Sequence, residues 1–149
     1  IHKKIPVAAI GVDVIAGFPG EDETAFENSR SLIDDLPVSY LHVFPFSPRQ
    51  GTPAAGFSGQ LNSRIIKERA QILRDLGKKK RMKFYESCLN KEFTVLAEGW
   101  HSNEKGIMNG LSDNYLPVVF PSEGSVKNEM VRLIIEKVEN EKAVGRVIF

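Results

Sequence analysis

The sequence contains a single cysteine, Cys88. One thiol cannot form a disulfide within the chain or supply a thiolate cluster for a metal. The three histidines, His2, His42 and His101, show no metal-ligand spacing with Cys88 or with one another, so we predict no metal site built by this chain alone. Because disulfides are rare in the reducing cytoplasm, we expect a cytoplasmic protein.

Long apolar runs and an excess of one charge are also lacking. No stretch of about 18 apolar residues is present, and residues 1–6 lack a signal-peptide pattern, so we expect neither a membrane partner nor secretion. The formal net charge is only +1 over 149 residues, which argues against a uniformly basic nucleic-acid binder. With 42% hydrophobic and 26% charged residues, the composition is that of a globular protein with one domain or two small ones.

Residues 1–60 predict a βαβ unit. Residues 7–16 form a nearly continuous apolar run, typical of a parallel strand covered on both faces, and residues 40–46 form a second strand. Asp22 can cap the helix between them, whose apolar stripe would comprise Phe26, Ile33 and Leu36. Such units build doubly wound sheets or (β/α) barrels, so one unit is not a finished domain.

Residues 61–90 predict a basic linking helix that begins at Asn62 or Ser63 and ends near Glu86. Gly77 is its weak point, because glycine is a poor helix former. Nine cationic residues stand against three acidic ones, which gives a local charge of +6. Its apolar residues are Ile65, Ile66, Ala70, Leu73, Leu76, Met82 and Phe84.

Residues 91–149 predict a small all-β domain. The short strands are expected at residues 92–97, 105–108, 115–120, 130–138 and 143–149. Five such strands suggest a five-stranded antiparallel barrel of the OB-like kind, so the expected fold class is α/β followed by all-β. From Asn90 onward seven cationic residues face nine acidic ones, a local charge of −2, so charge alone does not make this domain an RNA binder.

The first motif, residues 17–21 (GFPGE), follows the first predicted strand. It places glycines at the carboxyl end of a strand, where α/β folds bind ligands and where the backbone must approach closely. The phosphate-loop pattern GxxxxGK[ST] is absent, which disfavours a nucleoside triphosphate. A purely structural turn is the alternative interpretation.

The second motif, residues 44–54 (FPFSPRQGTPA), follows the second predicted strand. Its Arg49 guanidinium suits bidentate binding of a carboxylate, including that of an amino-acid-like cofactor. The alternative is a Pro-rich connector in which Arg49 forms a structural salt bridge. His42, in the middle of the strand, is interpreted as a packed histidine or as one that supports a ligand-binding residue, in preference to a ligand itself.

A dense basic cluster near the end of the predicted helix could contact RNA phosphates, because neutralising phosphates is what such patches do. The alternative is a solvated helix face whose cations favour the helix dipole. In the β-domain, Trp100, Tyr115 and Phe120 could stack on bases, although aromatic residues in a small barrel are more often core. The RNA-binding prediction comprises Tyr115 and the cluster Lys78, Lys79, Lys80, Arg81 and Lys83.

Four segments in order resemble one family: residues 13–21 (DVIAGFPGE), 42–55 (HVFPFSPRQGTPAA), 95–98 (VLAE) and 114–118 (NYLPV). They are similar to the radical S-adenosylmethionine methylthiotransferases of the 2-methylthioadenosine synthase type (MiaB- and MtaB-like). The first motif is shared widely among radical enzymes, whereas the second motif together with the terminal β-domain is specific. The resemblance covers nearly the whole chain.

The resemblance implies a three-part enzyme: an N-terminal domain with one 4Fe-4S cluster, a radical barrel with a second cluster on a CxxxCxxC motif, and a terminal TRAM domain that helps to engage tRNA. This chain would be the C-terminal fragment, with the end of the barrel and the TRAM domain. The missing initiator Met fits that expectation. Because both sets of cluster cysteines are absent, we expect no cofactor on this fragment, no catalytic residue in it and no activity by itself.

The resemblance also implies a cofactor site and a substrate. S-adenosylmethionine would lie near the first motif and near two residues of the second, so the candidate cofactor-binding residues are Ile15, Gly17, Phe18, Pro19, Gly20, Glu21, Ser47 and Arg49. The reaction implied is the addition of a methylthio group to C2 of an N6-modified adenosine 37 in tRNA. The SPRQGT form favours threonylcarbamoyladenosine, with isopentenyladenosine next.

Two other functions remain open: a freestanding RNA-binding module, and the branch of the family that modifies a ribosomal protein. The expected partners are tRNA and the missing N-terminal part of the polypeptide. Because a partial barrel exposes sheet edges and apolar faces, we also expect self-association.

Overall fold

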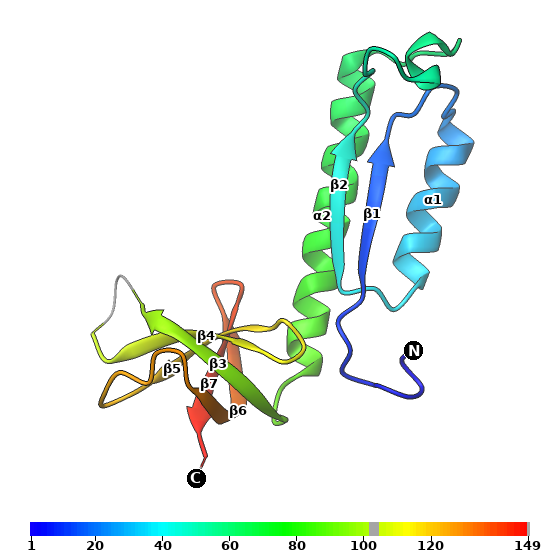
Figure 1. Cartoon of the computed structure of the whole chain (residues 1–149). Helices are drawn as coiled ribbons and strands as arrows, with labels where there is room; N and C mark the ends of the chain where they lie inside the picture. The colour runs from blue at the N-terminus through cyan, green and yellow to red at the C-terminus, as the bar shows by residue number, and fades with distance from the viewer. Residues whose placement is uncertain (102–104, 149) are drawn as a thin grey trace. The chain divides into compact units, whose positions relative to one another are not determined.

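The computed structural model describes residues 1–101 and 105–148. The chain divides into two compact units, one formed by Ile10–Arg81 and the other by Ile1–Ala9 together with Met82–Phe149. The boundary therefore falls near the end of the long helix, whereas the sequence suggested boundaries at residues 60 and 90. Figure 1 shows the elements of each unit.

The first unit is the predicted βαβ arrangement followed by a long helix. Its elements are β1 (Gly11–Ala16), α1 (Glu23–Asp35), β2 (Tyr40–Pro45), the short 3₁₀ helix η1 (Pro53–Gly56) and α2 (Ser63–Ser87). The two strands are parallel and pair in register from Gly11 with Tyr40 to Ala16 with Pro45. The α/β prediction is confirmed for this unit.

Local signals in the sequence explain where α1 begins and ends. The Asp22 side chain accepts a hydrogen bond from the backbone N–H of Ala25 at 2.8 Å, which is the predicted N-cap. Phe26 and Ile33 are buried as expected. Leu36 was predicted on the same stripe, but it is the C-cap residue with extended backbone and is 42% exposed, because the helix has already ended at Asp35.

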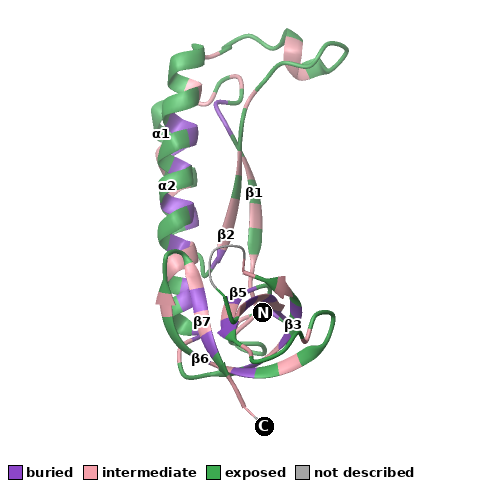
Figure 2. Ribbon diagram, turned by 90° about the vertical axis from the view of Figure 1, so that its left-hand side faces the viewer, coloured by how far each residue is buried: buried purple, intermediate pink, exposed green. Residues whose placement is uncertain are grey.

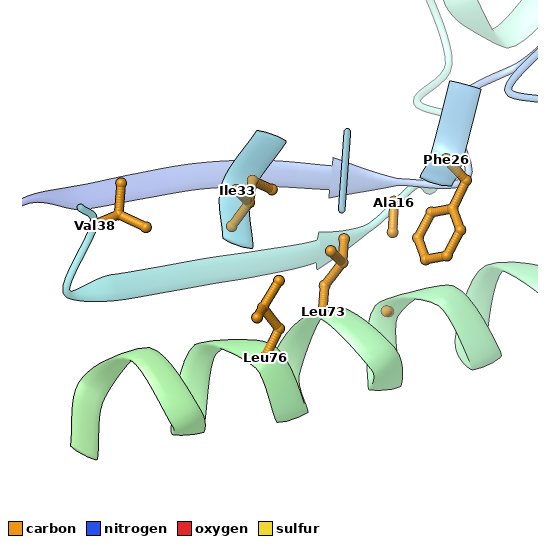
Figure 3. Close-up of a cluster of buried hydrophobic side chains, with 7 residues drawn as sticks. Ala16, Phe26, Ile33, Val38, Leu73 and Leu76 are labelled. Atoms are coloured by element: carbon orange, nitrogen blue, oxygen red, sulfur yellow. The ribbon is translucent and has the colours of Figure 1, made fainter. Parts of the chain in front are cut away.

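One hydrophobic cluster holds the sheet and both helices together. Phe26 and Ile33 of α1 meet Leu73 and Leu76 of α2 beside the strands, as Figure 3 shows. In Figure 2 the buried residues of α2 form a stripe along one side of the helix. Gly77 belongs to this contact, because a Cβ there would lie 3.1 Å from Cβ of Leu41 on β2. The glycine that weakens the helix therefore lets it approach the sheet closely.

Only one face of the β1–β2 sheet is covered within the described residues. Val12 and Val14 of β1 pack against the cluster, whereas Asp13 and Ile15, which alternate with them, are exposed. His42 and Phe44 on β2 are exposed too, so of the two interpretations of His42 the packed one does not hold within the described residues. The second covered face that the apolar run of β1 predicts is not formed by the described residues.

The second unit contains a closed five-stranded barrel. Its strands are β3 (Glu92–Trp100), β4 (Ile107–Ser112), β5 (Pro117–Pro121), β6 (Met130–Glu139) and β7 (Lys142–Val147), in the order β3-β4-β5-β7-β6. Four of the five pairings are antiparallel, but β5 and β7 pair in parallel through Val118 with Ala143 and Val119 with Val144. The predicted all-antiparallel barrel is therefore wrong at this pairing, where the chain closes the sheet by bringing β7 alongside β5. Phe149 lies outside the described residues.

Small and polar residues complete the barrel unit. Gly110 of β4 is required, because a Cβ there would clash with Cγ1 of Val95 on β3 and would lie 2.8 Å from the carbonyl oxygen of Leu96. The Asn114 side chain donates to the carbonyl of Val7 at 2.9 Å and contacts the sulfur of Cys88 at 3.8 Å. This amide ties the N-terminal residues and the end of α2 to the barrel.

Cys88 is fully buried, and burial raises the pKa of its thiol, an effect that the hydrogen bond from Asn114 only partly offsets. A raised pKa means less thiolate at a given pH, and the thiolate is the reactive form. We therefore expect iodoacetamide at pH 8 to alkylate the folded chain at least tenfold more slowly than the urea-unfolded chain, measured by mass spectrometry. As a matched control, the double variant Ser87→Cys, Cys88→Ala moves the thiol to an exposed position and should react rapidly. If the folded chain and the folded double variant were alkylated at equal rates, the burial of Cys88 would be contradicted.

Candidate functional site

The first motif forms a tight turn at the carboxyl end of β1, next to the carboxyl end of β2. The backbone N–H of Phe46 donates to the carbonyl of Ala16 at 2.8 Å, so the two motifs begin side by side. Gly17 and Gly20 have φ angles of 79° and 84°, a region that favours glycine. A Cβ on Gly17 would lie 2.6 Å from Cγ1 of Ile66 on α2, so this residue must be glycine for both conformation and space.

A buried ion pair between Glu21 and Arg69 of α2 holds the turn in place. One oxygen of the Glu21 carboxylate, Oε2, accepts from the backbone N–H of Gly17 at 2.8 Å and from Nη1 of Arg69 at 2.8 Å. The same Nη1 donates to the Glu21 carbonyl at 2.6 Å, and Nη2 donates to Glu23 at 2.9 Å. The guanidinium also lies 4.9 Å from the centre of the Phe26 ring, a cation–π distance. Arg69 thereby joins both ends of the turn to α2.

The Arg69 charge is held in a protein environment rather than in water. Its side chain is 7% exposed and that of Glu21 is 14% exposed. Burial alone would lower the pKa of Arg69, but the hydrogen bonds and negative charges of Glu23 and Glu21 outweigh it, and the pKa is raised. Arg69 therefore stays positively charged beside the two carboxylates. The Glu21 carboxylate is thus engaged with protein groups, whereas the sequence suggested that it lines the cofactor site.

Aromatic side chains lie along the other side of the turn. Phe18 makes edge contacts with Phe46, at 5.3 Å between ring centres, and with Phe57, at 6.2 Å. The backbone N–H of Gly20 donates to the carbonyl of Gly59 at 2.9 Å, so the segment after η1 returns to the turn. Phe18 is still 40% exposed and Ile15 is 54% exposed, which leaves apolar surface available for a ligand at this edge of the sheet.

Ser47 and Arg49, the polar residues of the second motif, are both exposed. The Arg49 carbonyl accepts from the backbone N–H of Thr52 at 3.1 Å and from its hydroxyl at 2.8 Å, which closes the loop into a turn. Within residues 1–101 and 105–148, no carboxylate pairs with the Arg49 guanidinium. The structural salt bridge considered as an alternative is therefore not formed there.

The predicted basic cluster separates into exposed and buried members. Lys78, Lys79 and Lys83 are exposed, and Arg81 is half-buried. Lys80 is 8% exposed, and its ammonium donates to the carbonyls of Asp34 and Leu36 at 2.6 Å each. A cation at the end of α1 satisfies carbonyls that the helix leaves unpaired and complements the helix dipole. Lys80 is therefore a structural residue, and its ammonium faces the end of α1 in place of the solvent.

The three candidate stacking residues of the barrel also differ in burial. Phe120 is fully buried and belongs to the core. Tyr115 is 70% exposed in the turn between β4 and β5, with a φ of 61°, and Trp100 is 47% exposed at the end of β3. Only the latter two present a ring surface to a ligand.

Sequence reasoning missed Arg69 and Glu23 as parts of the site. Arg69 was counted only as one of nine basic residues of the helix. Its position beside the apolar residues Ala70 and Leu73 was the available signal, because a charge on a buried stripe requires a partner.

The described residues lack two further features. They contain no group of three or more His, Cys, Asp or Glu side chains that could hold a metal ion. In this same part of the chain, no helix is long and apolar enough to cross a membrane.

Comparison with known proteins identifies the relatives of this chain. No protein-family model matches it. The threonylcarbamoyladenosine tRNA methylthiotransferase MtaB of Aquifex aeolicus is 44% identical over 91 residues, covering 61% of this chain and 22% of that protein. MtaB of Bacillus subtilis is 32% identical over 139 residues, covering 92% of this chain and 31% of that protein.

A differently named relative aligns with nearly the whole chain. The tRNA-2-methylthio-N(6)-dimethylallyladenosine synthase of Moorella thermoacetica is 29% identical over 148 residues, covering 99% of this chain and 33% of that protein. The chain belongs to the tRNA methylthiotransferase family of the MtaB and MiaB type. It spans a third or less of the length of these three relatives. The family resemblance seen in the motifs is confirmed.

We predict that the conformation of the GFPGE turn (residues 17–21) depends on Arg69. The variant Arg69→Met leaves Glu21 as an uncompensated buried charge, and breaking a buried pair in this way costs about 3–5 kcal/mol. It should lower the free energy of unfolding of the Ile10–Arg81 unit by that amount and speed hydrogen exchange at the Gly17 amide, measured by NMR.

The matched control is Arg64→Met on the same helix. Arg64 pairs with Glu68 at 2.8 Å, but the two side chains are 85% and 57% exposed, and such surface pairs contribute only about 0–1 kcal/mol. If Arg64→Met and Arg69→Met had equal effects, the turn would not depend on the buried pair.

Proposed function

We propose that this chain forms the end of the radical barrel and the terminal TRAM domain of an enzyme that adds a methylthio group to C2 of an N6-modified adenosine 37 in tRNA. The observation that carries the proposal is the GFPGE turn. Hydrogen bonds hold it at the carboxyl end of β1, beside the segment with Ser47 and Arg49, in a chain with relatives named as tRNA methylthiotransferases. The carboxyl ends of parallel strands are where such folds bind their ligands.

The residues present fit S-adenosylmethionine. Ile15 and Phe18 offer exposed apolar surface, and the Gly17–Gly20 backbone permits a close approach. The Arg49 guanidinium suits the carboxylate of the methionine portion, with the Ser47 hydroxyl beside it in the sequence. When bound, S-adenosylmethionine would supply the methyl group and, by reductive cleavage at an iron–sulfur cluster elsewhere in the enzyme, the radical that activates the substrate.

Glu21 has a different role in this proposal from the other members of the motif. Because its carboxylate accepts from Gly17 and Arg69, it orients the turn and does not itself bind the cofactor. Pro19 and Gly20 lie in the same turn, and the bond from Gly20 to Gly59 keeps that backbone in place. The chain therefore orients the cofactor and excludes water from its apolar side.

For tRNA, we propose that Lys78, Lys79 and Lys83, with Arg81 beside them, contact phosphates. These cations are on successive turns of α2 near its end, and cations on one exposed helix can follow a phosphate backbone. Tyr115 on the barrel is a further proposed contact, because its ring is exposed. Action on cytoplasmic tRNA agrees with a cytoplasmic location.

The favoured substrate is threonylcarbamoyladenosine, with isopentenyladenosine next. Two MtaB proteins are 44% identical to this chain over about 90 residues, and the relatives named as dimethylallyladenosine synthases are 29% and 35% identical over longer stretches. A ribosomal-protein substrate is less favoured, because these relatives are named for tRNA. A freestanding RNA-binding module is less favoured too, because it would not explain the GFPGE turn beside an Arg49 that pairs with no carboxylate of the described residues.

The proposed reaction can be tested with the longest natural polypeptide that contains this chain. Expressed in a bacterium whose own tRNA methylthiotransferases are deleted, it should restore 2-methylthio-threonylcarbamoyladenosine in tRNA hydrolysates, measured by liquid chromatography and mass spectrometry. A methylthio group on dimethylallyladenosine alone would contradict the substrate assignment. A methylthio group on a ribosomal protein, with unmodified tRNA, would contradict the proposed function.

The role of Arg49 can be tested by cofactor binding in the same polypeptide. Arg49→Ala removes a hydrogen bond between charged groups, which contributes about 1.5–3 kcal/mol, so the Kd for S-adenosylmethionine should rise at least tenfold in equilibrium dialysis. Arg132→Ala is the matched control, since Arg132 is a surface residue of the barrel paired with Glu92 at 2.6 Å. An unchanged Kd for Arg49→Ala would remove Arg49 from the site.

A further inference from the structure

A carboxylate and an imidazole lie side by side on the uncovered face of the β1–β2 sheet. Asp13 of β1 is directly opposite His42 of β2 in the parallel register, and both residues are exposed. Within residues 1–101 and 105–148, neither side chain has a hydrogen bond or an ion pair. We call Asp13 and His42 the polar pair. Its donors and acceptors are open to a ligand.

The polar pair interrupts an otherwise apolar strand. Residues 7–16 contain one ionisable side chain, that of Asp13. Its neighbours Val12 and Val14 pack into the hydrophobic cluster on the other face, so the packing of β1 does not require a carboxylate between them. A charged group costs free energy when it is enclosed, unless it has a partner. Asp13 therefore indicates a polar partner on the uncovered face.

A glycine leaves space next to the polar pair. Gly11 is the first residue of β1 and, two residues before Asp13, lies on the same face. A Cβ on Gly11 would have one heavy atom of the described residues within 4 Å, Nε2 of His42 at 4.0 Å. Because glycine has no side chain, the edge of the imidazole is open to a group of several atoms.

The uncovered face would be the inner face of the proposed barrel. Both helices, α1 and α2, pack against the other face of the sheet (Figure 3), and the helices of a (β/α) barrel form its outer ring. The polar pair is three residues before the carboxyl ends of the strands at Ala16 and Pro45, which is about 10 Å along a parallel strand. A substrate that enters from these ends can therefore reach the polar pair with a side group.

We propose that the polar pair recognises the N6 substituent of adenosine 37 and selects threonylcarbamoyl over dimethylallyl. His42 donates to the threonylcarbamoyl carboxylate, and Asp13 accepts from its hydroxyl. The inference rests on the proposed function, because it takes the modified adenosine as the substrate. The relatives of this chain are named for these two N6 groups, so the choice between them is the one that the site has to make.

The discrimination follows from the hydrogen bonds that each substituent leaves unmade. A threonylcarbamoyl group has a carboxylate, a hydroxyl and a urea, which give both members of the polar pair a partner. A dimethylallyl group has no hydrogen-bonding atom, so it would enclose Asp13 and His42 without partners. Sites built to hydrogen-bond a substrate reject an analogue that lacks the group by as much as about 10⁵-fold. The polar pair therefore acts mainly by excluding the apolar substrate.

The inference can be tested by binding, without turnover, in the longest natural polypeptide that contains this chain. Fluorescein-labelled tRNA stem-loops differ only at position 37, which holds threonylcarbamoyladenosine, its methyl ester or dimethylallyladenosine. Their Kd values are measured by anisotropy in the absence of a reductant. We expect the threonylcarbamoyl acid to bind at least tenfold more tightly than the ester, since a hydrogen bond to a charged group contributes about 1.5–3 kcal/mol.

Substitutions assign this preference to the polar pair. His42→Leu should bind the acid and the ester with equal Kd, whereas His42→Gln, which keeps a donor, should retain part of the preference. Asp13→Leu should reduce the preference for threonylcarbamoyl over dimethylallyl by about tenfold or more. Each comparison is a ratio of two Kd values for the same variant, so a lower fraction of folded protein does not change it.

The matched control is Asp35→Leu. Asp35 is an exposed carboxylate at the end of α1 in the same unit, away from the β1–β2 sheet face that carries the polar pair. This variant should keep both preferences of the unsubstituted polypeptide.

Two results would overturn the inference. The first is equal Kd values of the unsubstituted polypeptide for the acid and the ester. The second is a preference that His42→Leu and Asp13→Leu leave unchanged, which would mean that the polar pair binds other parts of the polypeptide.

The inference and the proposed function fail in different ways. A Kd preference that depends on His42, without methylthio transfer to tRNA, would contradict the proposed function and support the inference. Methylthio transfer to threonylcarbamoyladenosine by His42→Leu with an unchanged kcat/KM would support the proposed function and contradict the inference.

Discussion

The buried ion pair between Arg69 and Glu21 is the interaction on which the proposed cofactor site depends. One guanidinium contacts a carbonyl and two carboxylates that belong to the beginning of α1 and the turn before it. The two glycines at positive φ give the backbone of this turn wide conformational freedom, which the ion pair restricts. The cost of burying two charges is offset by several hydrogen bonds in one place. Such a pair specifies one conformation of the turn.

The helix α2 contributes a second buried cation that binds backbone carbonyls of α1 and its flanking residues. Arg69 reaches the beginning of α1, and Lys80, three turns later, reaches the carbonyls at its end. Between them, Leu73 and Leu76 contribute the apolar contacts. Two of the nine cations of α2, Arg69 and Lys80, thus bind groups at the two ends of α1. Net charge along a helix therefore overstates the charge available to a nucleic acid.

The sequence predicted what local patterns determine and missed what distant contacts determine. The Asp22 cap, the βαβ order, the long helix and five β-strands followed from periodicity and residue type. The burial of Lys80 and the role of Arg69 did not, because each depends on a partner more than forty residues away. The parallel pairing of β5 with β7 was missed for the same reason. The pattern of residues in a strand predicts which side chains face the core, but it does not predict which other strand pairs with it.

The uncovered face of the β1–β2 sheet has an order of its own. Because the strands pair in register, Asp13 lies opposite His42, and Ile15 lies opposite Phe44 one step nearer the carboxyl ends. Side chains that point inward from parallel strands stack in layers. A sheet extended by a further strand beside β1 or β2 would keep these two layers, one with Asp13 and His42 and the other with Ile15 and Phe44. In a barrel that enclosed this face, Ile15 and Phe44 would form an apolar layer at the mouth, and Asp13 and His42 would form a polar layer one step deeper.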